Sequence, residues 1–358
     1  MIRIDYLSVT ILFCIDRFCG ERSLSAVYNV LAGKKSTQIT QDIMWYNLEF
    51  LYKTFPHLTE ENFEIITRTL QEKQLIKVED KGTTITSLGK KILDQNLKEN
   101  PMPKYLNGWR FHKVAPIFWS RLSLAVQVLS NWAYGETKFF PVERNIVIQE
   151  QIRTWLKRKN PNKDKAELVN QFHAELFHLL KKAEKDQISP DCFVYKLTGF
   201  HSPGMTDHQL AQHLGMDEDY FLLSFQQILH YILDTIWKNQ RDFPLLWSLI
   251  PDLSFSLNLS RSATMTYNLW QEGRSMEEIA RIRQIKRNTV QDHIVEIALV
   301  DPDFSIDPFV DRKVQRKIMQ AVKSLNTKKL RRIKDVVPEA EYFEIRLVLS
   351  KYSQRVIR

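Results

Sequence analysis

The chain has 358 residues, of which 44% are hydrophobic and 26% are charged. One hydrophobic core usually stops growing at about 250–300 residues, so the length excludes a single small domain and predicts two or three modules. Both fractions are close to the globular average, which predicts that the whole chain folds.

The three cysteines form neither a disulfide framework nor a zinc-ligand pattern, and so few of them are typical of a reducing cytoplasm. An apolar run at the N-terminus lies between Asp5 and Asp16, which is far shorter than the ~20 residues that cross a bilayer. We therefore expect a buried first helix, no contact with a membrane and a cytoplasmic location.

The net charge of +9 is concentrated at one end of the chain. Residues 311–358 contain 14 lysines and arginines against 5 aspartates and glutamates, so the remaining residues are balanced. A concentrated excess produces a local positive potential that attracts polyanions.

Residues 1–100 follow the order of a winged-helix domain, in which helices precede a hairpin. Thr59 is placed to cap a helix that carries Phe63 and Leu70, and two β-rich runs meet around residues 80–82. Because this hairpin is not strongly basic, we favour a structural or protein-contact role for the domain.

The stretch "LAGKKSTQ" in this domain resembles the end of a phosphate-binding loop. A complete loop needs a glycine where this chain has Tyr28. We therefore predict that Gly33 ends a helix, that Ser36 or Thr37 starts the next helix, and that no nucleotide cofactor is bound.

Prolines after residue 100 mark a boundary, and residues 105–250 show helical spacing without strand alternation. Within them Thr206 and Gln209 form a capping box ahead of Gly215, in imitation of a helix-turn-helix. The following helix is acidic at its start and then apolar, so we predict a core or partner-docking element there. The histidines of this domain have no metal-site constellation around them.

Residues 257–358 form the third predicted domain, a helix-turn-helix domain with a basic helical tail. Its first helix is expected to end at Gly273, Ser275 and Glu278 to cap the second, and Asn288 to cap the third. Val290, Ile294 and Ile297 share one buried stripe of that third helix.

The opposite side of the third helix is predicted to face outward and to contact DNA. The residues expected to contact DNA here are Arg283, Lys286, Arg287, Asn288, Thr289, Gln291 and His293. Asp292 and Glu296 are also expected on this side, where they would repel phosphates. The prediction is therefore binding led by the DNA backbone, with a weak sequence preference.

A short basic helix near residues 327–336 completes the predicted DNA contacts. Its cations are Lys328, Lys329, Arg331, Arg332 and Lys334. If all five engaged phosphates, log K would fall with log salt at a slope of about −4 to −5. Arg346, further along, is expected to be an internal partner for a carboxylate and is not counted as a DNA contact.

Two segments, "LWQEGRSMEEIARIRQIKRNTVQDHI" and "KKLRRIKDVVPEAEYFEIRLVLS", resemble the helix-turn-helix module at the C-terminus of bacterial RecQ-type helicases. The arrangement of the whole chain is similar to the YpbB family. This resemblance implies an accessory subunit that acts with a RecQ-type helicase in DNA recombination or repair. The chain departs from many helix-turn-helix motifs at the turn, where Gln284 occupies the usual glycine position.

No enzyme signature is present in the sequence, so we expect no catalytic residues, no metal and no cofactor. Two other functions stay open. The stretch "TVQDHI" is also similar to the reading helix of LuxR-type transcription regulators, and the helical modules also fit a protein-binding scaffold without DNA contact.

Overall fold

The chain folds into two compact units in which helices predominate. The computed structural model describes residues 3–80, 82–160, 162, 164–251 and 259–352. The middle unit contains residues up to 9 and residues 94–251, and the terminal unit contains residues 10–93 and 259–352. The mainly helical fold predicted from the sequence is confirmed. None of the described helices combines the length and the apolar character needed to cross a membrane.

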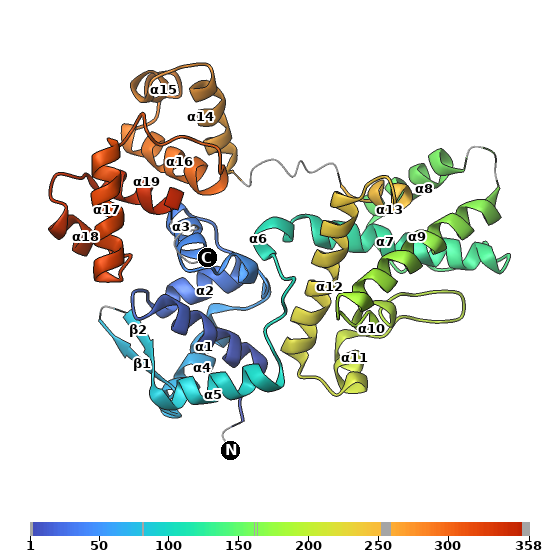
Figure 1. Ribbon diagram of the computed structural model, residues 1–358. Helices are drawn as coiled ribbons and strands as arrows, with labels where there is room; N and C mark the ends of the chain where they lie inside the picture. The colour runs from blue at the N-terminus through green and yellow to red at the C-terminus, as the bar shows by residue number, and fades with distance from the viewer. Residues whose placement is uncertain (1–2, 81, 161, 163, 252–258, 353–358) are drawn as a thin grey trace. The chain divides into compact units, whose positions relative to one another are not determined.

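The first half of the terminal unit has the predicted winged-helix-like order (Figure 1). Its elements are α1 (Tyr6–Phe18), α2 (Leu24–Ala32), α3 (Thr37–Trp45), a 3-10 turn (Glu49–Leu51), α4 (Glu60–Glu72), β1 (Ile76–Glu79), β2 (Gly82–Ile85) and α5 (Ser87–Glu99). The start of α1, up to residue 9, and the end of α5, from residue 94, belong to the middle unit. The strands pair antiparallel, with Ile76 opposite Ile85. Thr59 accepts the N–H of Asn62 at 3.2 Å and so caps α4, as predicted.

The stretch that resembles a phosphate-binding loop connects two helices. Gly33 ends α2 with φ of 76°, a left-handed conformation that glycine adopts without steric cost. A Cβ at this position would lie 2.3 Å from Cγ of Lys53, so the packing also requires glycine. Ser36 then accepts the N–H of Ile39 at 3.2 Å and starts α3. Both helix-boundary predictions are confirmed.

The second half of the terminal unit is the helix-turn-helix segment and the helices that follow it. Its elements are α14 (Arg261–Gln271), α15 (Met276–Ile282), α16 (Arg287–Val300), α17 (Arg312–Leu325), α18 (Leu330–Val336) and α19 (Tyr342–Tyr352). Helix α16 packs against α14, α15, α19 and also α3 from the first half (Figure 1).

This packing joins segments that the sequence predicts as separate domains, 1–100 and 257–358. In α16 Val290 and every residue from 293 to 299 are buried, which is more of its circumference than a three-helix bundle covers. Helix α3 supplies the missing cover, because its residues 39–45 are all buried. Residues 257–258 and 353–358 of the predicted third domain lie outside the described residues.

The middle unit is built on α12, which packs against α7, α9, α10 and α11. Its elements are α6 (Gly108–Phe111), α7 (Val114–Ala133), α8 (Ile146–Lys159), α9 (Lys165–Lys185), α10 (Asp191–Val194), α11 (Asp207–Leu214), α12 (Glu218–Lys238) and α13 (Pro244–Trp247). The predicted capping box of Thr206 and Gln209 is present at the start of α11. Phe221, Leu223 and Phe225 of α12 are buried, so this imitation of a helix-turn-helix is a core element, as predicted.

Candidate nucleic-acid interface

The first two helices of the helix-turn-helix are defined by their caps. Ser260 starts α14 by accepting the N–H of Ala263 at 3.1 Å. Ser275 and Glu278 form the predicted capping box of α15, since each side chain accepts the other's backbone N–H. These bonds satisfy donors that a helix start would otherwise leave unpaired.

The turn between α15 and α16 is made by Gln284 in place of glycine. Its φ is 51°, in the left-handed region, and the N–H of Ile285 donates back to the carbonyl of Ala280 at 3.0 Å. This bond closes a Schellman-type helix end, which glycine usually makes. Helix α16 then starts at Arg287, with Lys286 as its N-cap residue and no side-chain cap. The predicted cap at Asn288 is wrong, because the turn ends earlier than expected.

Arg283, predicted to contact phosphates, instead connects α15 to α14. Its Nη1 donates to the carbonyl oxygen of Ser262 at 2.7 Å and to the hydroxyl of Thr266, and its Nη2 donates to the Ser262 hydroxyl at 2.8 Å. Burial lowers the pKa of this guanidinium. The prediction that Arg283 faces DNA is wrong, because these bonds hold the guanidinium within the helix pair.

His293 and Glu296, both expected to face outward, are buried. The Nδ1 of His293 lies 2.9 Å from the Thr266 hydroxyl. The carboxylate of Glu296 accepts the backbone N–H of Ser260 at 2.5 Å and its hydroxyl at 2.8 Å, which ties α16 to the start of α14. This carboxylate also lies 3.7 Å from the ammonium of Lys35, just ahead of α3. The outward-facing prediction is wrong for both residues because α16 is covered on a second side.

Arg346 is mostly buried and pairs with a carboxylate, as predicted. Its guanidinium lies 2.7 Å from the carboxylate of Asp292, and so links α19 to α16. With the amide of Gln41 oriented so that its oxygen faces Arg346, Nε donates to that oxygen at 3.0 Å. The contacts of Arg346 therefore join α19, α16 and α3.

The accessible part of α16 is its start. Lys286, Arg287 and Asn288 are exposed, and Thr289 and Gln291 are partly exposed. The guanidinium of Arg287 lies 3.2 Å from the carboxylate of Glu277, so part of its charge is compensated.

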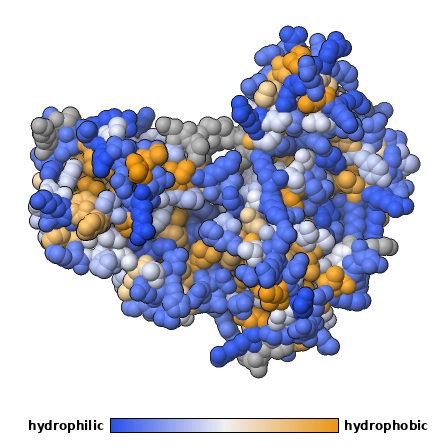
Figure 2. Space-filling model, turned by 180° about the vertical axis from the view of Figure 1, so that it is seen from behind, coloured by the Kyte–Doolittle hydropathy of each residue, from blue (hydrophilic) through white to orange (hydrophobic). Residues whose placement is uncertain are grey.

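The surface beside this turn is partly apolar. Met265 and Ile282 are 52% and 54% exposed, and Figure 2 shows hydrophobic residues at the end formed by α14 and α15. The helix-turn-helix tip is therefore less cationic than the sequence predicts.

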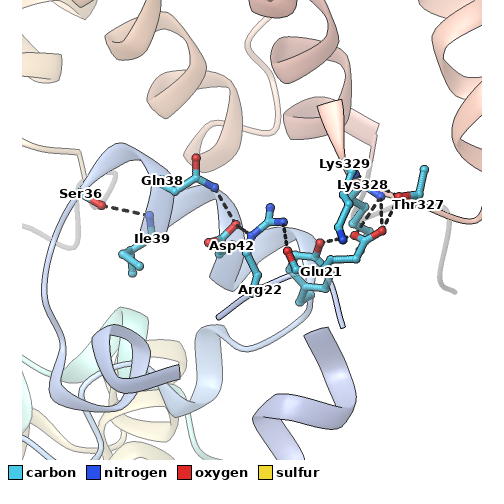
Figure 3. Close-up of polar contacts among 10 residues, drawn as sticks. Glu21, Arg22, Ser36, Gln38, Ile39, Asp42, Thr327, Lys328 and Lys329 are labelled. Carbon is cyan, nitrogen blue, oxygen red and sulfur yellow. Dashed lines mark hydrogen bonds and ion pairs between the residues drawn. The ribbon is translucent and has the colours of Figure 1, made fainter. Parts of the chain in front are cut away.

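Three of the five predicted cations around α18 are engaged inside the terminal unit. The backbone N–H of Lys328 donates to Glu21 at 3.1 Å (Figure 3). The ammonium of Lys328 lies 4.7 Å from the ring centre of Tyr46. Burial lowers the pKa of Lys328. Lys329 donates to the carbonyl of Gly20 at 3.4 Å, and Lys334 donates at 2.7 Å to two backbone carbonyls that follow α18.

Arg331 and Arg332 remain exposed on α18, and no ion pair involves either of them within the described part of the chain. Helix α17 adds Lys313, Arg316 and Lys323, which are also exposed and belong to no described ion pair. These three are not among the DNA-contacting residues predicted from the sequence. Their spacing could have identified them, because α17 has an apolar stripe and its other faces are rich in cations.

Figure 1 shows α17, α18 and α19 side by side in the terminal unit, where α19 and α18 both pack on α17. These cations therefore belong to the same folded body as the helix-turn-helix. The structure brings the start of α16 and the basic helices into one unit. It buries His293, and it engages Arg283, Lys328, Lys329 and Lys334, which stay partly exposed, in contacts within that unit. No group of three or more histidines, cysteines or acids in the described residues is arranged to hold a metal ion.

Comparison with known proteins agrees with this arrangement. Residues 262–349 match a family model described as a helix-turn-helix domain. The match runs from α14 into α19, so the helices after α16 are part of the domain. The chain is 30% identical to Protein YpbB of Bacillus subtilis over 98% of its own length and 99% of that protein. No solved structure matches the chain.

Proposed function

The chain belongs to the YpbB family and contains a helix-turn-helix domain, and from this premise we propose that it is a non-catalytic DNA-binding subunit that partners a RecQ-type helicase in recombination or repair. The DNA-binding part of the proposal rests on one observation: the helix-turn-helix domain carries exposed arginines and lysines without carboxylate partners among the described residues. A helicase partner is what the resemblance to the YpbB family implies.

The burial of α16 favours binding led by the DNA backbone. A helix that reads bases inserts several side chains into the major groove. Here the accessible residues of α16 are Arg287, Asn288, Thr289, Gln291, the acidic Asp292 and, at the far end, Val300. Exposed arginines and lysines bind phosphates of any sequence, and they also fix the orientation of the protein. A weak sequence preference, supplied by Asn288, Thr289 and Gln291, is compatible with this surface.

The salt dependence expected from the exposed cations can be stated for each helix. Arg331 and Arg332 alone would give a slope of log K against log salt near −2, by the ~0.9 per phosphate contact of duplex DNA. Lys313, Arg316 and Lys323 of α17 would extend the slope to about −4 to −5 if all five cations bind phosphates.

The decisive experiment measures how tightly the purified full-length chain binds a forked DNA at several salt concentrations. We compare the double variant Arg331→Gln, Arg332→Gln with a control, Lys157→Gln, Arg158→Gln, which removes two adjacent exposed cations from α8. The α18 variant should lose about 2 units of salt slope, and the α8 variant should keep the slope of the natural chain. Equal slopes in the two variants, or no DNA binding, would contradict the DNA-binding role.

The helicase part is tested separately, by identifying the proteins that co-purify with this chain from its native cells. A RecQ-type helicase in stable association is the expected result. If no helicase is recovered, and the two pure proteins do not associate, the partnership is wrong. The alternative function, a transcription regulator, is tested by selecting the DNA duplexes that the chain binds from a random pool. One strongly preferred sequence would indicate transcriptional control.

A further inference from the structure

A cleft of about 580 Å³ lies within the terminal unit, between α2 and α3 on one side and the segment that leads into α18 on the other. We call it the α2–α18 cleft. Four cationic residues line it: Arg22, Lys328, Lys329 and Arg331. Two acidic residues, Glu21 and Asp42, also line it, so its formal charge is positive.

Both acids accept hydrogen bonds from neighbouring residues. Asp42 accepts from Nε of Arg22 at 2.8 Å and from the Gln38 amide at 2.9 Å (Figure 3). Burial raises the pKa of Asp42, while the adjacent Arg22 lowers it.

Glu21 accepts from the Tyr46 hydroxyl at 2.5 Å, from the Thr327 hydroxyl and from the backbone N–H of Lys328 at 3.1 Å. These bonds hold the Glu21 carboxylate in place through both of its oxygens, and the bonds from Arg22 and Gln38 hold Asp42 through Oδ1. The two acids are thus bonded to Arg22, Gln38, Tyr46, Thr327 and the Lys328 backbone, and no described ion pair joins either of them to Lys329 or Arg331.

Donors are available to a ligand on both sides of the cleft. Arg331 is exposed and enters no ion pair among the described residues, so its guanidinium can form a bidentate contact. Trp45, which is 1% exposed, lines the cleft from α3, and its indole N–H has no hydrogen-bond partner in the described structure. An unpaired buried donor is costly.

A phosphate group fits this set of donors. It carries several acceptor oxygens and negative charge, and it prefers arginine and lysine together with N–H donors. The first residues of α2 also line the cleft, and the dipole of a helix favours an anion at that end. We propose that the α2–α18 cleft binds a phosphate group, supplied by the DNA that the proposed function brings to this unit.

This proposal assigns different roles to neighbouring arginines. Arg331 lines the cleft and would hold the bound phosphate, whereas Arg332, its neighbour on the same helix, does not line it. Both are exposed, so replacing either by glutamine should leave the fold intact. Arg332→Gln is therefore the matched control for Arg331→Gln.

The test titrates inorganic phosphate into the full chain and measures binding by calorimetry and by the rise in unfolding temperature, against chloride at equal ionic strength. The natural chain and Arg332→Gln should show a saturable response, and Arg331→Gln should weaken phosphate binding about tenfold or more, which is the loss expected for a charge-assisted bond. No saturable response, or equal weakening by the two variants, would overturn the cleft site.

Binding of forked DNA, measured in parallel, separates this proposal from the proposed function. If phosphate competes with DNA and Arg331→Gln weakens both, the cleft holds a DNA phosphate. If DNA binds but phosphate does not saturate, the cleft proposal fails and the DNA-binding role stands. If phosphate saturates but DNA does not bind, the cleft is a site for a free phosphate compound, and the proposed function fails.

Discussion

The guanidinium of Arg283 lies 3.2 Å from Nδ1 of His293, so two basic groups meet inside the helix-turn-helix. Thr266 lies beside both, because its hydroxyl accepts from Arg283 and lies 2.9 Å from the same imidazole nitrogen. The arrangement is consistent when His293 is neutral and Nδ1 is an acceptor, since Thr266 can then donate to it. A protonated His293 would lose this bond and repel Arg283.

The first prediction concerns pH. Burial, together with Arg283, lowers the pKa of His293 below its usual value near 6.5. The unfolded chain therefore takes up a proton at a higher pH than the folded chain, so the stability present above about pH 6.5 falls as the pH decreases below it. The variant His293→Gln should lose less stability than the natural chain between about pH 7.5 and about pH 5.5, as measured by urea unfolding.

His230 of the middle unit also lowers the stability of the fold as the pH decreases, because burial lowers its pKa to about 3. Its effect is present in both the natural chain and the His293→Gln variant, and cancels when their pH profiles are subtracted. Identical profiles for the two chains would show that His293 is not held neutral.

The second prediction concerns Arg283. Replacing it with methionine keeps much of the side-chain volume but leaves the Ser262 carbonyl and the Thr266 hydroxyl without their donor. The variant should be less stable by about 1–3 kcal/mol, the cost of leaving buried polar groups unpaired. Arg281→Met is the control, because Arg281 is exposed on the same helix and its loss should change stability by less than about 0.5 kcal/mol. Equal effects of the two substitutions on chemical denaturation would contradict the structural role of Arg283.

The third prediction concerns the turn. Gln284 has a φ of 51°, and a left-handed conformation costs a residue with a Cβ about 1–2 kcal/mol. Gln284→Gly should raise the free energy of unfolding by about 0.5–1 kcal/mol, since part of the relief is offset by the entropy of glycine. Gln291→Gly, inside α16, should lower it by about 1 kcal/mol. Denaturant unfolding of both variants distinguishes the two positions, and a destabilised Gln284→Gly would show that the glutamine side chain is needed there.

The fourth prediction concerns the ion pair between Arg346 and Asp292. A double-mutant cycle with Arg346→Met and Asp292→Ala should give a coupling energy of about 0.5–1.5 kcal/mol, because the pair is partly buried and geometrically close. The pair of Arg312 with Asp307 is the reference, since Arg312 is largely exposed and its cycle should give less than about 0.5 kcal/mol. A coupling near zero for both pairs would mean that Arg346 does not stabilise the contact of α19 with α16.

Local structure in this chain followed from local sequence. The helix end predicted at Gly33 and the helix starts predicted at Ser36, Thr59 and Ser275 are present in the structure. Each of them depends on a backbone conformation or a hydrogen bond within a few residues. Gln284 was harder to predict, because its left-handed conformation is imposed by the packing of the helices on either side. The comparison with other helix-turn-helix motifs, which have glycine where this chain has Gln284, predicts where the turn lies but not its backbone geometry.

The candidate site was predicted less well, because burial of α16 is decided by residues 250 positions away in the sequence. The stripe of Val290, Ile294 and Ile297 correctly gave one buried side. The run "HIVEIALV" is apolar almost all round, which is typical of a helix covered on several sides. That pattern could have indicated that His293 and Glu296 are internal. Hydrophobic periodicity does not predict which segment covers α16, and in the structure that segment is α3.

The packing of α3 on α16 has a consequence for synthesis of the chain. The segments that meet there lie near opposite ends of the polypeptide, and at about 5–20 residues per second the ribosome makes the second one roughly 13–50 s after the first. During this interval the apolar side of α3 has no partner to cover it. We expect nascent chains stalled before residue 287 to require a chaperone, and full-length chains to be released from it once the last helices emerge.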